Sequence, residues 1–349
     1  MEVADSSRFP YRTVGLIETD GATCTGTIIG PRHVLTAAHC LLDVQKTRSW
    51  RNNPLFYPGR NGIAGLPYET LRITRAYVPK AYLDSLQADG QSWAIDIEDG
   101  GRTDLSSFVH NTLKLDYAVA ELDLPVGDKT GWIGLVEPSP TTAPFMQIAG
   151  YPIDKGRYRQ WFSLCQSRWQ DWALEHRCDL TPGMSGAAAL TRSFDDSYAA
   201  VGLYAAGSHQ VNYLIPLTGP TMANIRDWRS GHVNDQTVFN DFRHKDSYSI
   251  RIANECNRNI YAVIHYRNDK EQWSTSKWLE IPAGQIRAVA DSSSAIFYLY
   301  AETAGVNTIR FEGTDLKKKI GTSPREYNLR KVTVEDERFI PFIYPLSCP

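Results

Sequence analysis

The sequence predicts an all-β protein, because short segments in which apolar and polar residues alternate follow one another along most of the 349 residues. Such alternation places the apolar side chains of a strand on one face. Gly and Pro separate these segments, as expected where short strands are joined by tight turns. The composition, with 42% hydrophobic and 22% charged residues, is ordinary for a soluble globular protein.

The first third of the chain opens with antiparallel strands. Residues 9–42 alternate, and Gly30-Pro31-Arg32 supplies a turn between two apolar runs. Residues 43–110 are rich in loop signals and therefore predict surface insertions. A strand-like run from Leu71 to Val78 interrupts them.

The middle third returns to the strand pattern and then ends in a helix. Ile225 and Trp228 have helical spacing and Gly231 follows, which predicts a terminal helix over residues 217–228. Residues 232–246 are polar and aperiodic, and we expect a linker there. The expected strands cover residues 118–122, 145–150, 157–165, 187–190 and 199–204.

The last segment, residues 247–349, has a different character. Its alternating runs are rich in aromatic and β-branched residues and are separated by turns. We therefore predict a first domain over residues 1–231 and a separate, small β-sandwich-like domain over residues 247–349, whose role is unknown.

Three short segments carry the groups that acyl transfer requires. His39 lies in Thr-Ala-Ala-His-Cys, Asp116 begins Asp-Tyr-Ala-Val-Ala, and Ser185 lies in Pro-Gly-Met-Ser-Gly. A serine hydroxyl is a weak nucleophile at neutral pH, so it needs an imidazole to accept its proton and a carboxylate to orient that imidazole. The sequence supplies all three, in the order His, Asp, Ser.

These segments resemble those of the trypsin-like serine proteases, and most of all the secreted bacterial glutamyl endopeptidases. The resemblance covers residues 9 to about 230. It implies two antiparallel six-stranded β-barrels with a C-terminal helix, and a secreted serine endopeptidase that needs no cofactor or metal. It also implies that His39, Asp116 and Ser185 form the catalytic triad, with protein or peptide substrates.

The nucleophile segment also implies an oxyanion hole. The backbone N–H groups of Gly183 and Ser185 can converge on a developing negative charge, and glycine permits the unusual backbone geometry that this requires. In trypsin, the residue directly before the nucleophile is an aspartate that pairs with the freed N-terminal amine. Here that residue is Met184, which excludes activation by such an ion pair.

The resemblance further indicates residues that bind a substrate side chain. Glutamyl endopeptidases use a histidine where this chain has Tyr204, so glutamate preference is in doubt. Asp179 falls where trypsin holds a basic side chain, but it is equally compatible with a hydrogen-bonded turn. The primary specificity therefore stays open. The residues expected to bind substrate are Asp179, Thr181, Tyr204, Ala205, Gly207 and Asn212.

Six cysteines without a Cys-x-x-Cys pair favour three disulfides and an oxidising, extracellular compartment. Residues 1–20 lack the continuous apolar region of a signal peptide. Fifteen connectivities are compatible with six cysteines. We expect Cys24–Cys40, because this pair is bonded in the resembling family, and Cys165–Cys178, because both lie in one segment just before the nucleophile turn. Cys256 and Cys348 are left to form the third pair.

Several alternatives stay open. Asp96 is a rival to Asp116 as the orienting carboxylate, and the acidic group of Asp96, Glu98, Asp99 and Asp104 offers a weaker calcium hypothesis without the pattern of a dedicated loop. The net charge of −2 indicates no nucleic-acid partner, and Lys317–Lys319 is expected in a solvated loop. No apolar stretch approaches the ~20 residues of a membrane span.

Two other functions compete with the enzyme, which we expect to be a monomer. In one, the first domain is a catalytically silent binding or adhesion module. In the other, the C-terminal domain is the main functional part and binds a cell surface or a polysaccharide through Trp273, Trp278 and Tyr300.

Overall fold

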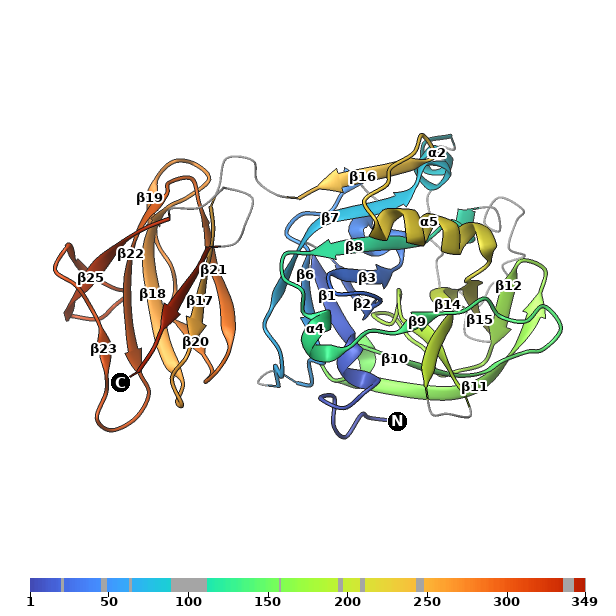
Figure 1. Ribbon diagram of the computed structural model, residues 1–349, viewed down its shortest axis with the longest axis horizontal. Helices are drawn as coiled ribbons and strands as arrows, with labels where there is room; N and C mark the ends of the chain where they lie inside the picture. The colour runs from blue at the N-terminus through green and yellow to red at the C-terminus, as the bar shows by residue number, and fades with distance from the viewer. Residues whose placement is uncertain are drawn as a thin grey trace. The chain divides into compact units, whose positions relative to one another are not determined.

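In the computed structural model the chain forms two compact units, Met1–Phe242 and Arg243–Pro349 (Figure 1). Most of the structured residues lie in strands, which confirms the all-β prediction. The structure describes residues 1–19, 22–44, 49–62, 65–88, 112–156, 158–193, 197–207, 211–242, 248–334 and 342–348.

The first barrel closes through the order β7-β6-β1-β2-β3-β8, because β8 also pairs with β7. All six pairings are antiparallel. A further strand, β16, extends this sheet along β7. The strands are β1 (Val14–Thr19), β2 (Ala22–Ile28), β3 (His33–Thr36), β6 (Leu55–Pro58), β7 (Leu71–Pro79), β8 (Ala118–Leu122) and β16 (Thr237–Asp241).

The second barrel has the order β13-β10-β11-β12-β15-β14 and closes through β13 and β14. It too is antiparallel, and the short strand β9 (Gly134–Leu135) adds a parallel pairing to β14. Its strands are β10 (Phe145–Gly150), β11 (Trp161–Gln170), β12 (Ala173–His176), β13 (Ala188–Arg192), β14 (Tyr198–Gly207) and β15 (Asn212–Pro216). The two predicted six-stranded barrels are thus confirmed.

The terminal helix is α5 (Gly219–Arg229), close to its predicted position. Ile225 and Trp228 are fully buried, as their helical spacing requires. The remaining short elements of this unit are η1 (Tyr11–Thr13), α1 (Ala38–Leu41), β4 (Leu42–Asp43), β5 (Ser49–Trp50), α2 (Lys80–Ala88), α4 (Gly127–Thr130) and η2 (Ile153–Lys155).

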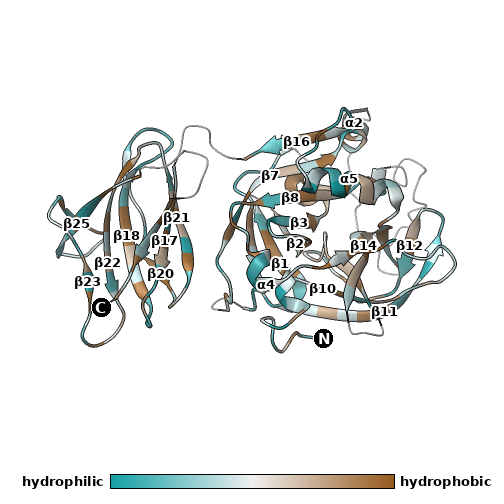
Figure 2. Cartoon of the chain, viewed as in Figure 1, coloured by the Kyte–Doolittle hydropathy of each residue, from teal (hydrophilic) through white to brown (hydrophobic). Residues whose placement is uncertain are grey.

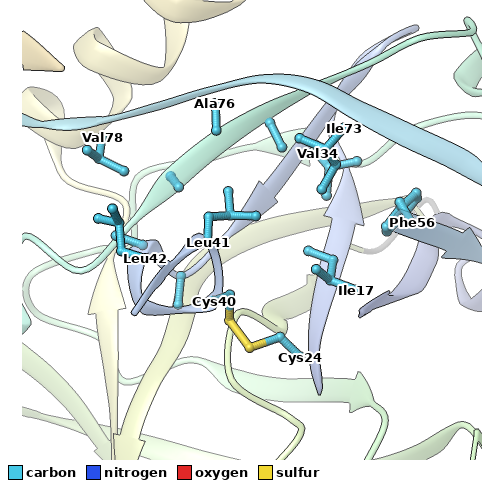
Figure 3. Close-up of a cluster of buried hydrophobic side chains, with 14 of the residues drawn as sticks. Ile17, Cys24, Val34, Cys40, Leu41, Leu42, Phe56, Ile73, Ala76 and Val78 are labelled. Carbon is cyan, nitrogen blue, oxygen red and sulfur yellow. A yellow bond between two sulfur atoms is a disulfide. The ribbon is translucent and has the colours of Figure 1, made fainter. Parts of the chain in front are cut away.

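Each barrel has its own apolar core, and a third apolar cluster joins them. Figure 3 shows Ile17, Val34 and Phe56 in the core of the first barrel, beside the Cys24–Cys40 disulfide. The joining cluster combines Leu35 and Val119 of the first barrel with Leu203 and Ile215 of the second, and Trp228 of α5. The apolar segments of the strands are brown in Figure 2. The joining cluster forms an apolar layer that holds the two barrels together, so that residues from both can form one site.

The second unit consists of two sheets with an apolar core between them. The smaller sheet contains β17 (Tyr248–Asn254), β21 (Ile286–Ser292) and β26 (Phe342–Leu346). The larger contains β18 (Ile260–Arg267), β19 (Trp273–Thr275), β20 (Leu279–Ile281), β22 (Ile296–Thr303), β23 (Arg310–Phe311), β24 (Leu316–Lys319) and β25 (Glu326–Thr333). This arrangement is sandwich-like, as expected.

The structure also differs from three expectations. Residues Thr237–Asp241, within the expected linker, form β16, because the edge of β7 offers backbone groups that need hydrogen-bond partners. Lys317–Lys319 lies in strand β24 rather than in a loop. Lys80–Ala88 is helical although only loops and strands were expected there.

The chain contains three disulfides, Cys24–Cys40, Cys165–Cys178 and Cys256–Cys348. None of the helices that the structure describes is long and apolar enough to cross a membrane.

The position of β16 predicts where the first unit can be truncated. A chain that ends after Phe242 should melt higher than one that ends after Gly231, which loses β16 and the 3.0 Å hydrogen bond from Trp228 Nε1 to Thr237 Oγ1. We expect a difference of about 2 kcal/mol in the free energy of unfolding, or roughly 4–8 °C. Thermal unfolding followed by circular dichroism measures it. Equal melting temperatures would show that β16 contributes no stability.

Candidate active site

His39 and Asp116 meet because strands β3 and β8 are paired. Thr36 of β3 lies opposite Ala118 of β8. His39 follows Thr36 by three positions and Asp116 precedes Ala118 by two, so the two residues lie close together. The backbone N–H of His39 donates to Asp116 Oδ1 at 2.9 Å, and its Nδ1 lies 2.6 Å from Oδ2. Asp116 is only 2% exposed. Two hydrogen bonds therefore fix the imidazole against a buried carboxylate.

The surroundings of His39 favour its protonated form. Burial is the largest single effect and acts to lower its pKa. The charge of Asp116 and the hydrogen bond to it act in the opposite direction, and Arg51 opposes them weakly. Together the two Asp116 effects prevail, so the pKa of His39 is raised above its usual value.

Helix α2 brings Tyr82 to the same carboxylate. Tyr82 is 2% exposed, and burial, the charge of Asp116 and a hydrogen bond to that carboxylate raise its pKa well above the usual value. The hydroxyl therefore stays protonated and can donate to Asp116 at any physiological pH.

Ser185 lies in a tight turn between β12 and β13, and glycines on both sides make the turn possible. Gly183 has φ +95° and Gly186 has φ +83°, both in the region that disfavours other residues. A Cβ on Gly186 would lie 2.2 Å from Thr36 Oγ1, so the turn packs directly against the segment that carries His39. The carbonyl of Ser185 accepts a 2.8 Å hydrogen bond from the N–H of Thr25.

A second loop fixes the backbone of the nucleophile turn. The N–H of Ile153 donates to the carbonyl of Pro182 at 2.9 Å. In a trans peptide unit the C=O and N–H point in opposite directions, so this bond also directs the N–H of Gly183 away from Ile153. Thr25 Oγ1 donates to the carbonyl of Gly183 at 2.9 Å and accepts from the N–H of Tyr151 at 3.1 Å.

Two side-chain contacts hold this loop in place. Thr181 Oγ1 donates to Asp154 Oδ1 at 2.5 Å. Lys155 forms an ion pair with Asp179. We call the loop 151–156, with these contacts, the turn clamp. It restrains the peptide units on which the direction of the Gly183 N–H depends.

Comparisons with known proteins concern the fold of the first unit. Residues 2–65 match the family model described as Trypsin. A solved structure of a Glu endopeptidase in complex with MPD superposes with a TM-score of 0.54 and 24% identity, and covers 66% of this chain and 96% of that one. The chain has the fold of the trypsin-like serine proteases.

Two proteases are similar in sequence to the first unit. Glutamyl endopeptidase of Bacillus licheniformis is 28% identical over 193 residues, which are 55% of this chain and 52% of that protein. Serine protease 23 of Bos taurus is 30% identical over 201 residues, 53% of this chain and 47% of that protein. This chain thus spans about half the length of these relatives.

The trypsin-like fold brings together only part of the expected substrate pocket. Tyr204 and Asn212 are both buried, and the Tyr204 hydroxyl donates to Asn212 Oδ1 at 3.3 Å. Gly207 packs directly against Asn212, since a Cβ at position 207 would lie 1.8 Å from Asn212 Oδ1. Ala205, 7% exposed, follows Tyr204 in β14. Asn212 Nδ2 donates to the carbonyl of Cys178 at 2.8 Å.

Asp179 and Thr181 take other partners. The side chain of Asp179 is 71% exposed and its charge is matched by Lys155, so it does not bind as a buried anchor for a basic substrate side chain. Thr181 is engaged by Asp154. Both residues belong to the turn clamp, because their side chains point to loop 151–156.

Sequence reasoning missed several residues of the site, namely Thr25, Tyr82, Ile153, Asp154 and His176. His176 is 3% exposed, and its ring lies 6.3 Å from that of Tyr204. Burial lowers the pKa of His176 to about 4, so it is neutral in this position. None of these residues lies in a recognisable motif. Only the adjacency of Thr25 to Cys24 signalled its position beside the His39 segment.

The rival Asp96 and the acidic group Asp96, Glu98, Asp99 and Asp104 lie outside the described residues. Within the part of the chain that the structure describes, two groups have metal-ligating atoms close together, Cys24–His39–Cys40 and Cys165–His176–Cys178. In both, the two cysteines form a disulfide, and their sulfurs are not the thiolates that metals bind.

The charge of Asp116 should determine the titration of His39. In Asp116→Asn, burial and Arg51 remain while the carboxylate is lost, so the pKa of His39 should fall from above to below its usual value of about 6.5. NMR titration of the imidazole measures this shift. His33 serves as the internal control, because burial, Arg229 and Arg32 hold its pKa at about 4 in both proteins. A His39 pKa that stays raised would show that another group stabilises the imidazolium.

Proposed function

We propose that this chain is a secreted serine endopeptidase with the triad His39, Asp116 and Ser185. The observation that carries the proposal is the two-point contact between His39 and the buried Asp116, made beside the Ser185 turn. This contact leaves the other ring nitrogen, Nε2, free of the carboxylate. It can therefore accept the proton of a serine hydroxyl.

In the proposed reaction, Ser185 Oγ attacks the carbonyl carbon of the scissile peptide bond while His39 accepts its proton. The N–H groups of Gly183 and Ser185 stabilise the negative charge that forms on the carbonyl oxygen. His39 then transfers the proton to the departing amine, and an acyl group remains on Ser185. Water, activated by His39, releases it. Asp116 keeps the imidazole oriented and stabilises its cationic form.

We further propose that the substrate side chain next to the scissile bond is uncharged. Tyr204 stands where glutamyl endopeptidases have a histidine, and its hydroxyl is already bonded to Asn212. Asp179 is exposed and paired with Lys155. Among the described residues assigned to the pocket, no charged group is thus available to neutralise an acidic or a basic side chain.

The three disulfides, which persist in oxidising compartments, support an extracellular location for the proposed enzyme. We propose that it is a monomer and acts on proteins or peptides. The alternative is a catalytically silent binding or adhesion module, which an intact triad disfavours. We also propose that residues 247–349 supply no catalytic group and bind a surface or polysaccharide ligand.

Replacement of the nucleophile tests the function directly. Ser185→Ala and His39→Ala should abolish both peptide cleavage and labelling by a fluorophosphonate, because each removes one partner of the nucleophilic pair. Activity-based labelling with mass spectrometry measures this. The matched control is Ser230→Ala, an exposed serine after α5, which should label and cleave like the parent protein. A parent protein that neither labels nor cleaves would favour the silent module.

The turn clamp should contribute to the rate rather than to substrate binding. Asp154→Ala removes the bond to Thr181 and loosens loop 151–156. Complete loss of one oxyanion donor costs on the order of 10² to 10³ in rate, so partial loss of the Gly183 geometry should lower kcat about tenfold. KM should change less than about twofold, because the interaction acts mainly in the transition state.

Steady-state kinetics on a short peptide distinguish the roles of Asp154. Asp128→Ala, an exposed acid in α4, is the control and should leave both constants unchanged. A raised KM with an unchanged kcat would mean that the loop contacts the substrate and does not orient the oxyanion donors.

A further inference from the structure

The larger sheet of the second unit has an outer face rich in aromatic residues. Along β18, Ile260, Ala262 and Ile264 point into the core between the sheets. The alternate residues Tyr261, Val263 and His265 therefore face outward. In β22, Tyr298 and Tyr300 lie opposite His265 and Val263 and so share this outer face.

Three exposed aromatic side chains follow β18 along this face. Tyr261 and Trp278 are each 37% exposed and Trp273 is 48% exposed. Trp278 directly precedes Leu279, which pairs with Ala262, so it lies at the level of Val263. Trp273 stacks on His265, with ring centroids 5.1 Å apart. The row from Tyr261 to His265 covers four residue steps along the strand, or about 14 Å.

Neighbouring aromatic side chains, one of them fully buried, hold the two tryptophans in place. Trp278 packs edge-on against Tyr300 at 5.9 Å and Tyr327 at 5.4 Å. Trp273 contacts Tyr298 at 5.7 Å. Tyr300 is fully buried and so supports Trp278 instead of meeting a ligand, contrary to the expectation that it forms part of a binding surface. Rigid aromatic surfaces lose little conformational entropy on binding.

Positive charge flanks the aromatic row. Lys318 lies close enough to His265 that, after burial, its ammonium is the next cause that lowers the pKa of His265. Arg325 lies over the ring of Tyr327 at 4.8 Å. In the part of the second unit that the structure describes, neither cation forms an ion pair, and Glu326 follows Arg325 directly in the chain.

The acidic groups of this face already have partners. Glu302 accepts a 2.7 Å hydrogen bond from the Tyr300 hydroxyl and pairs with Arg310 at 3.9 Å. Glu280, opposite Tyr261, accepts a 2.8 Å bond from Asn259 Nδ2. Because Asn259 is neutral, Glu280 keeps its charge at the Tyr261 end. Lys318, by contrast, lies near His265, on which Trp273 stacks. Arg325 lies over Tyr327, against which Trp278 packs. This part of the face is complementary to a negatively charged ligand.

We propose that Tyr261, Trp278 and Trp273, flanked by Lys318 and Arg325, bind an extended chain of an anionic polysaccharide. The apolar face of a sugar ring packs on an aromatic ring, and the length of the row suits several linked rings better than one small molecule. Carboxylate or sulfate groups on the sugars would meet the ammonium and the guanidinium. This binding does not depend on the proposed protease activity.

Native affinity electrophoresis of the full chain, carrying Ser185→Ala to prevent proteolysis, tests the proposal. Polygalacturonate should retard the protein and neutral dextran should not. Trp273→Ala or Trp278→Ala should weaken the apparent affinity for polygalacturonate about tenfold, and Lys318→Gln about threefold. Lys318→Gln alters one half-buried side-chain terminus, so it keeps the test valid if a tryptophan variant fails to fold.

Two matched controls separate this site from general attraction. Lys317→Gln changes the neighbouring exposed lysine on the opposite face of β24, and Trp132→Ala removes a tryptophan of the first unit that is 45% exposed. Both should bind as the parent does. The proposal is overturned by an absence of retardation, by equal retardation in dextran, or by a Lys317→Gln protein that loses as much affinity as Lys318→Gln.

Discussion

The apolar layer between the two barrels is the constraint on which the first unit depends. Leu35 and Val119 from one barrel pack with Leu203 and Ile215 from the other, and Trp228 of α5 closes the layer. Burial of each such side chain stabilises the folded protein by roughly 1.5–3 kcal/mol. His39 follows strand β3 and Asp116 precedes strand β8 of the first barrel, whereas Ser185 precedes strand β13 of the second, so their proximity requires this packing.

Around that layer, hydrogen bonds set the finer geometry of the site. Asp116 is buried and meets the backbone and ring of His39 as well as the hydroxyl of Tyr82. Thr25 binds the carbonyls of both Gly183 and Ser185, and Ile153 binds that of Pro182. Backbone groups of the nucleophile turn are therefore restrained from two sides, by a strand of one barrel and a loop of the other. In the reaction that we propose, such a preorganised turn would stabilise developing charge without reorganisation.

Most of the fold could be predicted from the sequence, and the errors have identifiable causes. Alternation revealed the strands, and the spacing of Ile225 and Trp228 revealed α5. Strand β16 was missed because its residues are mostly polar and become ordered only by pairing with β7. Asp179 was assigned to a substrate pocket by its position before Ser185, but its direction depends on Lys155, which is 24 positions away. Lys318 was expected in a loop, but it lies in β24, opposite Tyr327 of β25.

The sequence by itself determined the candidates for the triad, because His39, Asp116 and Ser185 each lie in a short local segment that can be recognised without the fold. It also determined the alternation that makes both units β-rich. Only the tertiary structure decided which groups hold these residues in position. Asp154 lies 27 positions from Thr181, Tyr82 lies 34 positions from Asp116, and Thr25 lies 158 positions from Gly183. Such contacts leave no local pattern, since they arise from how strands and loops that are distant in the chain pack together.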